Sequence, residues 1–363
     1  MDIILLAAFG LVFVINLIYY LFYLNFISKK QKAFASLQEA PLSVILYLKN
    51  NQENLHESIG LILEQDYKNY ELIIVNDSSI DDSIFELEEL EKQHPQIKLV
   101  DVKSNEHFWG NKKYALTLGI KRASSQNLVF VSPQFKPTNK NWLKSISLQA
   151  KDKQVELGYY KYQANKSLGN VFARFYHMKE MVLSFANLTS GLPYYANFYN
   201  KSYKASLYYE HSGFMNFMKI PEAENNLFIQ EIANKENTFI NFDADNFVVE
   251  NTPFSWKAWY ENHKQSLKNK KLISSSQKMG IRVFPVTEFL LLPLFVVLAF
   301  VNLFFFQMAA IAIVVRFVVQ FFFYRKTTLK LQEPYLIWLF PVLNQFTNLF
   351  YLHTFFNYLR SRH

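Results

Sequence analysis

Two short patterns in this sequence carry side chains that bind metal ions or phosphates. Asp243 and Asp245 are separated by one residue, a spacing at which two carboxylates can share a divalent cation. They lie in the run FDADN, far downstream of the strands predicted below, and this composition is typical of a turn, so we interpret them as turn residues. Lys112 and Lys113 are adjacent cations that could meet phosphates. A solvated helix face is the alternative for both lysines, and this is the more usual setting for such residues.

The elements that would position such side chains alternate between strands and helices. Short apolar, β-branched runs predict strands at 41–48, 70–75, 97–102 and 127–131, and apolar residues at helical spacing predict helices at 53–64, 81–93 and 110–123. This alternation predicts a parallel, doubly wound α/β sheet. Ligands of such sheets bind outside the carboxyl ends of the strands. We therefore expect the chemistry in the loops at 76–82 and 132–137.

The pattern loosens after about residue 150. Residues 167–185 are amphipathic, and this helix could lie on a membrane surface or pack on the sheet. Residues 256–271 are aromatic at the start and basic at the end, which predicts an interfacial helix ahead of a membrane span.

The first segment of the chain predicts a membrane anchor. No charged residue occurs between Ile3 and Leu24, a length that can cross a hydrocarbon core as a helix. The run starts with Asp2 and no small-residue cleavage site follows it, so we predict an uncleaved anchor over 1–28. Lysines follow directly, and the positive-inside rule then places the segment 29–282 in the cytoplasm.

Two further apolar tracts predict a C-terminal membrane region. We expect a helical hairpin over 283–326 and a kinked or interfacial helix over 334–363. Glu288 and Arg316 are the two charges inside the hairpin. Counted from the cytoplasmic ends at a rise of about 1.5 Å per residue, they lie at similar depths, so we predict that they pair. Separate snorkelling of each side chain to the headgroups is the alternative.

Composition excludes several classes of protein. The chain is 50% hydrophobic and 17% aromatic, which is too apolar for a disordered protein. Its net charge of +8 comes mostly from lysines and arginines beside the apolar tracts. This pattern indicates contact with anionic lipids and no nucleic acid. The absence of cysteine excludes disulfides and thiolate metal sites.

Five segments, taken in order, resemble the membrane-bound family 2 glycosyltransferases of bacteria, which are inverting enzymes of the GT-A fold that use nucleotide sugars. These segments are PLSVILYLKNNQENL, VNDSSIDDS, FWGNKKYALTLGIKRA, PTNKNWL and YKASLYYEHSGF. The resemblance implies a GT-A domain with a nucleotide-binding half over 41–150 and an acceptor half over 151–282. It implies that Asp77, Asp81, Lys112 and Lys113 are the nucleotide-binding residues. For Asp77 the alternative is a turn or helix-capping role.

The catalytic motifs of that family are degenerate here. The resemblance implies a metal-binding DxD motif after Val131, but the chain reads Ser132-Pro133-Gln134, and these side chains provide no negative charge. We therefore expect no metal cofactor, although a nucleotide or nucleotide sugar remains a possible ligand.

The position of the catalytic base is also altered. The general base aligns with Asn225, whose amide cannot take a proton. Glu224 is adjacent and ionisable, and a neighbouring side chain usually points elsewhere. The QxxRW motif of the family retains only a cation, Lys264.

These losses suggest three functions. The leading hypothesis is an inactive pseudoglycosyltransferase, a binding or scaffolding subunit that works with other envelope-assembly proteins and membrane lipids. The alternative is an active, metal-independent transferase with Glu224 as base and Lys112, Lys113 and Lys264 as electrophiles. A transport element built from the C-terminal helices is a third, weaker hypothesis.

Overall fold

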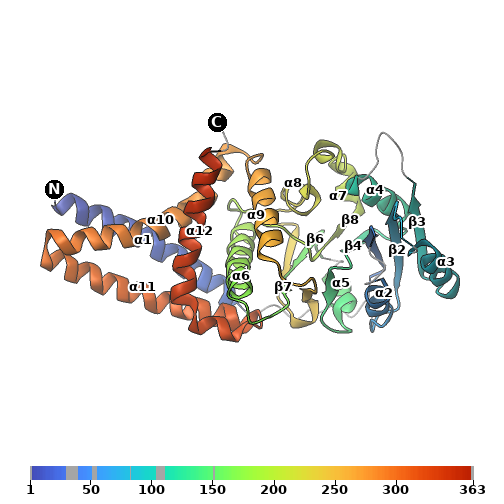
Figure 1. Ribbon diagram of the computed structural model, residues 1–363, viewed down its shortest axis with the longest axis horizontal. Helices are drawn as coiled ribbons and strands as arrows, with labels where there is room; N and C mark the ends of the chain where they lie inside the picture. Colours follow the sequence, from blue (N-terminus) through green and yellow to red (C-terminus); the bar gives the residue numbers. More distant parts are fainter. Residues whose placement is uncertain are drawn as a thin grey trace. The chain divides into compact units, whose positions relative to one another are not determined.

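The chain folds into two compact units, and the computed structural model describes residues 2–29, 40–50, 55–81, 83–103, 111–149 and 152–360 (Figure 1). The first, here called the membrane-helix unit, comprises Met1–Lys30, Lys166–Tyr195 and Lys270–His363. The second, the sheet unit, comprises Gln31–Asn165 and Ala196–Asn269.

The first half of the sheet unit has the predicted alternation of strands and helices. In chain order the elements are β1 (Leu42–Leu48), α2 (Leu55–Leu63), β2 (Tyr70–Asp77), α3 (Ser83–Gln93), β3 (Ile97–Val102), α4 (Lys112–Arg122) and β4 (Asn127–Val131). The four strands are parallel in the order β3-β2-β1-β4. Nearly every residue of β1 is buried, as expected for a parallel strand covered on both faces.

Helix α4 lies unusually close to this sheet. A Cβ added at Gly119 would come within 2.6 Å of the Val75 side chain and 3.1 Å of Ile45. Only glycine leaves room for this approach. The glycine therefore fixes the position of α4, whose N-terminus carries Lys112 and Lys113.

The second half of the sheet is mixed, which corrects the purely parallel prediction. Strand β8 (Lys201–Lys204) runs antiparallel to both β4 and β6 (Val155–Gly158), and β9 (Thr238–Asn241) pairs with β6 in parallel. The full order is β3-β2-β1-β4-β8-β6-β9. The remaining helical elements of this half are α5 (Trp142–Gln149), α7 (Ala205–Glu210), the 3-10 turn η3 (Ala223–Asn225), α8 (Leu227–Ile232) and α9 (Trp256–Lys270).

A second, three-stranded sheet was not predicted. It consists of β5 (Phe135–Pro137), β10 (Val248–Glu250) and β7 (Tyr160–Tyr162), in the order β5-β10-β7. Strands of three residues are too short to show a two-residue period in the sequence.

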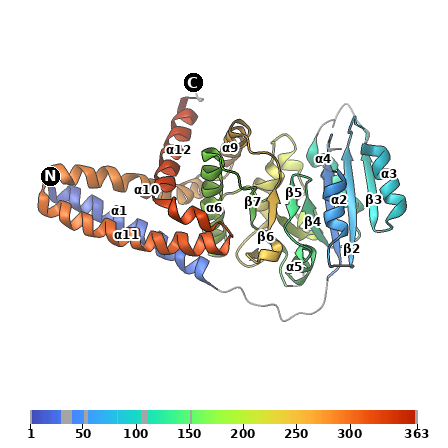
Figure 2. The same ribbon diagram turned by 60° about the horizontal axis from the view of Figure 1, so that its bottom comes forward.

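The membrane-helix unit contains a long anchor helix and a hairpin that pack together (Figure 2). Its helices are α1 (Asp2–Ser28), α6 (Leu168–Thr189), α10 (Ser275–Val301), α11 (Leu303–Lys330) and α12 (Phe340–Arg360). The hairpin turns at Asn302, whose side chain accepts hydrogen bonds from the backbone N–H groups of Phe304 and Phe305. Helix α6 packs against α1 and α12, so its apolar face is covered by protein.

Three helices in the described part of the chain are long and apolar enough to span a membrane, namely α1, α10 and α11. Helix α12 does not meet these criteria, and its interfacial placement remains a prediction. The last three residues of the predicted segment, 361–363, lie outside the described residues.

A buried polar cluster joins five helices of this unit, and it contains the predicted ion pair of Glu288 and Arg316. Asn16 on α1 donates to Glu288 Oε1 at 3.0 Å and accepts from Arg316 Nε at 2.8 Å. Asn344 on α12 donates to Glu288 Oε2 at 2.9 Å, and Lys179 on α6 donates to Asn344 Oδ1 at 2.7 Å. The pair therefore fixes α1, α6 and α12 against the hairpin.

We expect Glu288→Ala to lower the stability of the unit by about 3 kcal/mol, because it leaves Arg316 and Lys179 buried without a counter-charge. The double substitution Glu288→Gln, Arg316→Gln should recover part of this loss. The thermal midpoint of the purified protein in detergent measures both effects. Val296→Ala, at an exposed position on α10, serves as the control. An unchanged midpoint for Glu288→Ala would contradict the assigned role of the cluster.

In the sheet unit, Glu156 on β6 is buried without a cationic partner among the described residues. Its Oε1 accepts from Asn241 Nδ2 at 2.8 Å and from Asn246 Nδ2 at 3.0 Å. Burial raises the pKa of Glu156 from 4.5 to about 8, although both hydrogen bonds favour the charged form. The side chain is therefore mostly protonated at neutral pH.

This raised pKa predicts that the protein loses stability as the pH rises. The folded state holds a proton that the unfolded state releases above pH 4.5, so the loss develops between pH 4.5 and 8. Glu156→Gln should remove this dependence, matching the wild type at pH 5 and exceeding its thermal midpoint by several degrees at pH 8. Parallel pH profiles of the two proteins would contradict the prediction.

Candidate active site

The candidate site lies at the carboxyl ends of β1, β2 and β4. The chain runs outward from β1 to β2 and β3 and then returns to the other side of β1 with β4, which makes the carboxyl ends of β1 and β4 the switch point of the sheet. Asp77 ends β2 there and is buried. It accepts from Tyr47 Oη at 2.8 Å and from Lys49 Nζ at 3.2 Å.

Asp81 has a local role at the start of the next helix. Its Oδ1 accepts a hydrogen bond at 3.4 Å from the backbone N–H of Ser83, the first residue of α3. This contact agrees with capping of the helix. The contacts of Asp77 and Asp81 do not test the nucleotide-binding role that the resemblance implies for them.

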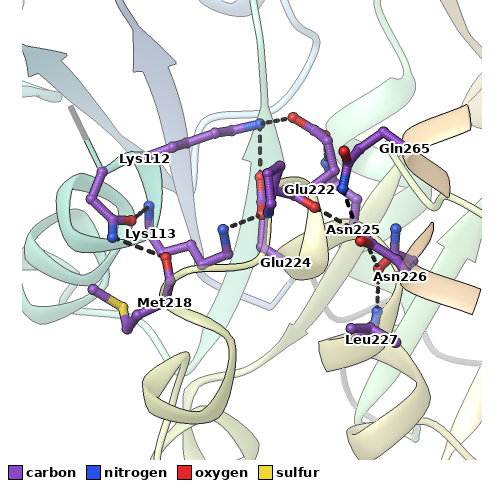
Figure 3. Close-up of polar contacts among 12 residues, drawn as sticks. Lys112, Lys113, Met218, Glu222, Glu224, Asn225, Asn226, Leu227 and Gln265 are labelled. Carbon is purple, nitrogen blue, oxygen red and sulfur yellow. Dashed lines mark hydrogen bonds and ion pairs between the residues drawn. The ribbon is translucent and has the colours of Figure 1, made fainter. Parts of the chain in front are cut away.

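Glu224 lies between two lysines at the centre of the site (Figure 3). Lys112 Nζ is 2.8 Å from Glu224 Oε1, and Lys113 Nζ is 3.4 Å from Oε2. Both lysines project from the first turn of α4, which Asn111 caps by accepting from the Lys113 backbone N–H. Asn111 also donates to the Met218 carbonyl at 3.0 Å, which holds the helix end against the segment leading to Glu224.

The residues around Glu224 extend this network. Glu222 has a left-handed backbone, with φ of 59°, and its Oε1 lies 3.6 Å from Lys112 Nζ. Its Oε2 accepts from Asn225 Nδ2 at 2.6 Å and from Tyr199 Oη at 3.2 Å. Lys201 on β8 donates to the Glu224 carbonyl at 3.0 Å and to Asn225 Oδ1.

Burial and neighbouring charges strongly shift the pKa values of Glu224 and Lys201 in this site. Burial alone would raise the pKa of Glu224, but Lys112, Lys113 and Lys201 outweigh it and hold that pKa at about 2. Burial lowers the pKa of Lys201 to about 7, against the opposing effects of Glu224 and Glu222. With all groups ionised, three lysines face two glutamates, which leaves one excess positive charge.

These contacts correct two sequence-based interpretations. Lys112 and Lys113 do not form a solvated helix face, because both pair with Glu224 and the Lys113 side chain is only 5% exposed. Glu224 does not point away from the site: its side chain is 2% exposed and meets both lysines, while the Asn225 side chain is held by Lys201 and Glu222.

The degenerate metal motif forms an ordinary turn. Ser132 Oγ accepts from the backbone N–H of Gln134 at 3.4 Å, and Gln134 is exposed. No group of three or more histidine, aspartate or glutamate side chains that could hold a metal ion occurs among the described residues. Asp243 Oδ1 accepts from the backbone N–H of Asp245 at 3.1 Å, which confirms the turn interpretation of this pair.

Lys264 does not join the lysine cluster. It lies on α9, where its Nζ is 2.7 Å from Glu261 Oε1. The same Nζ makes a cation–π contact with the Tyr260 ring, 5.2 Å from the ring centroid. Asn269, further along α9, instead contacts the site segment, donating to the Pro221 carbonyl at 2.7 Å. Sequence reasoning missed this contact.

Sequence reasoning also missed Lys201, Tyr47, Lys49 and Glu222. Strand β8 reads Lys-Ser-Tyr-Lys, and nothing in this sequence distinguishes Lys201 from an ordinary exposed lysine.

Comparison with known proteins finds a family match for part of the chain. Residues 43–218 match the family model described as Glycosyl transferase family 2. A curated protein of Haemophilus influenzae, named an uncharacterized glycosyltransferase, is 38% identical over 73 residues, which is 20% of this chain and only 23% of that relative. A mannosyltransferase from Pyrobaculum calidifontis, solved in complex with GDP-Man and Mn²⁺, has a similar fold. Its TM-score is 0.54 at 16% identity, over 96% of this chain and 99% of that one.

We expect ligand binding at this site to be indifferent to metal ions, because Ser132 and Gln134 offer no charge to a cation. Calorimetric titration of UDP should give the same affinity in Mn²⁺, in Mg²⁺ and in EDTA. A clear gain in affinity with either metal would contradict this expectation.

Proposed function

Because the segment 43–218 belongs to glycosyl transferase family 2 and has the GT-A fold, we propose that this protein is a membrane-anchored pseudoglycosyltransferase. It holds a nucleotide sugar or glycan ligand without transferring the sugar. It serves as a binding or scaffolding subunit of bacterial envelope glycan assembly, alongside membrane lipids and other envelope-assembly proteins.

The observation that carries this proposal is the pairing of Glu224 with two lysines, which keeps its carboxylate ionised and weakly basic. A general base works best when its pKa lies near the working pH. The carboxylate of Glu224 has a pKa of about 2 and is held by two ammonium groups, so it has little tendency to take a proton from a hydroxyl. Asn225 cannot substitute for it, since an amide does not accept a proton at neutral pH.

The leaving-group side of the reaction is weakened as well. Departure of a nucleoside diphosphate concentrates negative charge, which a divalent cation normally neutralises. The mannosyltransferase of similar fold was solved with Mn²⁺. In this chain the turn after β4, where the family resemblance implies the metal motif, carries Ser132 and Gln134, and lysines are left to meet that charge.

A metal-independent transferase is the second candidate, and one observation favours it. Lys112, Lys113 and Lys201 converge on Glu224, and with Glu222 included and all groups ionised the cluster carries one excess positive charge. A bound diphosphate would draw Lys112 and Lys113 away from Glu224, and the pKa of that carboxyl group would then rise towards the useful range. Lys264 lies outside this lysine cluster. The transport hypothesis has no comparable observation in its favour.

The proposed location follows from the order of charges along the chain. Lys29 follows α1 directly, and the lysine-rich end of α9 precedes α10. Under the positive-inside rule, both support our proposal that the sheet unit lies on the cytoplasmic side of the inner membrane. There it would meet cytoplasmic nucleotide sugars and membrane-bound partners.

We expect the purified protein in lipid nanodiscs to release no nucleoside diphosphate from UDP-sugars or GDP-mannose above the background rate. Glu224→Gln should leave this result unchanged, and Glu210→Gln, at an exposed position on α7, provides the matched control. Turnover that falls about 10²-fold or more in Glu224→Gln but not in Glu210→Gln would make Glu224 the base and establish the transferase instead.

A further inference from the structure

The small sheet of the sheet unit places a carboxylate in a row of aromatic rings. Glu250 on β10 is the register partner of Phe135 on β5 and of Tyr162 on β7. Directly opposed residues of neighbouring strands share a face of the sheet. The three side chains therefore form one row across the sheet, with an acid between two aromatic residues.

Two further tyrosines complete an aromatic cluster around this row. The Tyr199 ring stacks on Phe135 with centroids 4.6 Å apart and planes 14° apart, and Tyr160 meets both rings edge-on at 5.2 Å. Tyr160 also lies edge-on to Tyr162 at 6.0 Å. Phe135 and Tyr160 are buried, whereas Tyr162 and Tyr199 are half-buried and reach the surface.

Packing within this small sheet does not explain why an acidic residue occupies position 250. The residue is half-buried, and no basic side chain among the described residues forms an ion pair with it. Burial raises the pKa of Glu250 to about 7, against a hydrogen bond from Thr252. A carboxylate in this position costs stability, and a hydrophobic or amide side chain would pack there without that cost. A ligand that donates hydrogen bonds to it would offset the cost.

We propose that Tyr162, Tyr199 and Glu250, with the buried Phe135 supporting the Tyr199 ring, form a carbohydrate-binding platform that takes an uncharged sugar ring. A pyranose presents apolar C–H faces, which can lie against aromatic rings, and hydroxyl groups, which can donate to a carboxylate. The site excludes a phosphate group, because the platform carries an acid and no cation. The platform thus accepts the neutral glycan part of a ligand, while the lysine cluster offers the charge that a phosphate needs.

The platform adjoins the candidate active site through Tyr199. Its hydroxyl group donates to Glu222 Oε2 at 3.2 Å, and Glu222 Oε1 lies 3.6 Å from Lys112 Nζ. The inference deepens the proposed function, because it names the class of ligand that the sheet unit holds. It does not depend on whether the sugar is transferred.

Saturation-transfer NMR on the full-length protein in nanodiscs tests the proposal. The probes are tetrasaccharides of glucose, N-acetylglucosamine, mannose and galactose, with irradiation of the aromatic protein resonances. We expect transfer to ring C–H protons of at least one probe. Glu250→Gln, which keeps the shape but removes the charged acceptor, should weaken its binding about tenfold. Tyr199→Ala should weaken binding to a similar extent, because it removes the half-buried stacking ring.

Controls separate a binding role from a packing role. Tyr199→Phe keeps the ring, so it should retain most of the binding, and near-wild-type melting curves verify that each variant is folded. Tyr209→Ala removes a tyrosine that is 56% exposed and packs on Tyr208 instead, and it should leave binding unchanged. Absence of transfer to all four probes would overturn the platform, as would transfer that survives both Glu250→Gln and Tyr199→Ala. Nucleotide-sugar turnover would refute the pseudoenzyme alone and leave the platform standing.

Discussion

The ion pairs of Glu224 with Lys112 and Lys113 are the constraint on which the candidate site depends. A carboxylate that is 2% exposed is tolerable only if cations replace the water it has lost. Both cations come from the first turn of α4, whose distance from the sheet is set by the close packing at Gly119. The segment that carries Glu224 is thereby fixed to the helix most able to reach a phosphate. Substitution of Glu224 would leave the buried Lys113 without its counter-charge, whereas loss of either lysine would leave Glu224 with a single ammonium partner.

In this site, lysine side chains provide the positive charge that a bound metal ion would otherwise supply. A metal ion adds two positive charges to a site when it binds, and acidic ligands must be present to retain it. Here the positive charge is covalently part of the chain, and the acids are Glu222 and Glu224 instead of a motif after β4. Such a site keeps its positive charge without binding a metal ion. However, the same lysines lower the pKa of Glu224, and a carboxylate of low pKa is a weak acceptor for the proton that a general base must take.

Sequence reasoning succeeded where apolar periodicity is strong. Strands β1 to β4 were predicted because each is a mainly apolar run rich in β-branched residues and bounded by turn residues. The Glu288–Arg316 pair followed from the depths of the two residues in the predicted hairpin. The three-residue strands of the small sheet and the four-residue β8 carry no readable period. Lys201 was missed for that reason, and the direction of Glu224 was misjudged because the direction of a side chain in a 3-10 turn is set by tertiary contacts.

Two of the charge clusters in the described part of the chain differ in exposure, and this difference suggests different roles. In the membrane-helix unit, Lys179, Glu288 and Arg316 have side chains that are at most 6% exposed, and both oxygens of Glu288 accept hydrogen bonds from neighbouring helices. That cluster is closed to ligands, and its role is to fix the positions of the helices relative to one another. In the sheet unit, Lys112 and Glu222 retain 32% and 37% of their exposure. These ions can change partners without unfolding the chain, and only a site of this kind can admit a charged ligand.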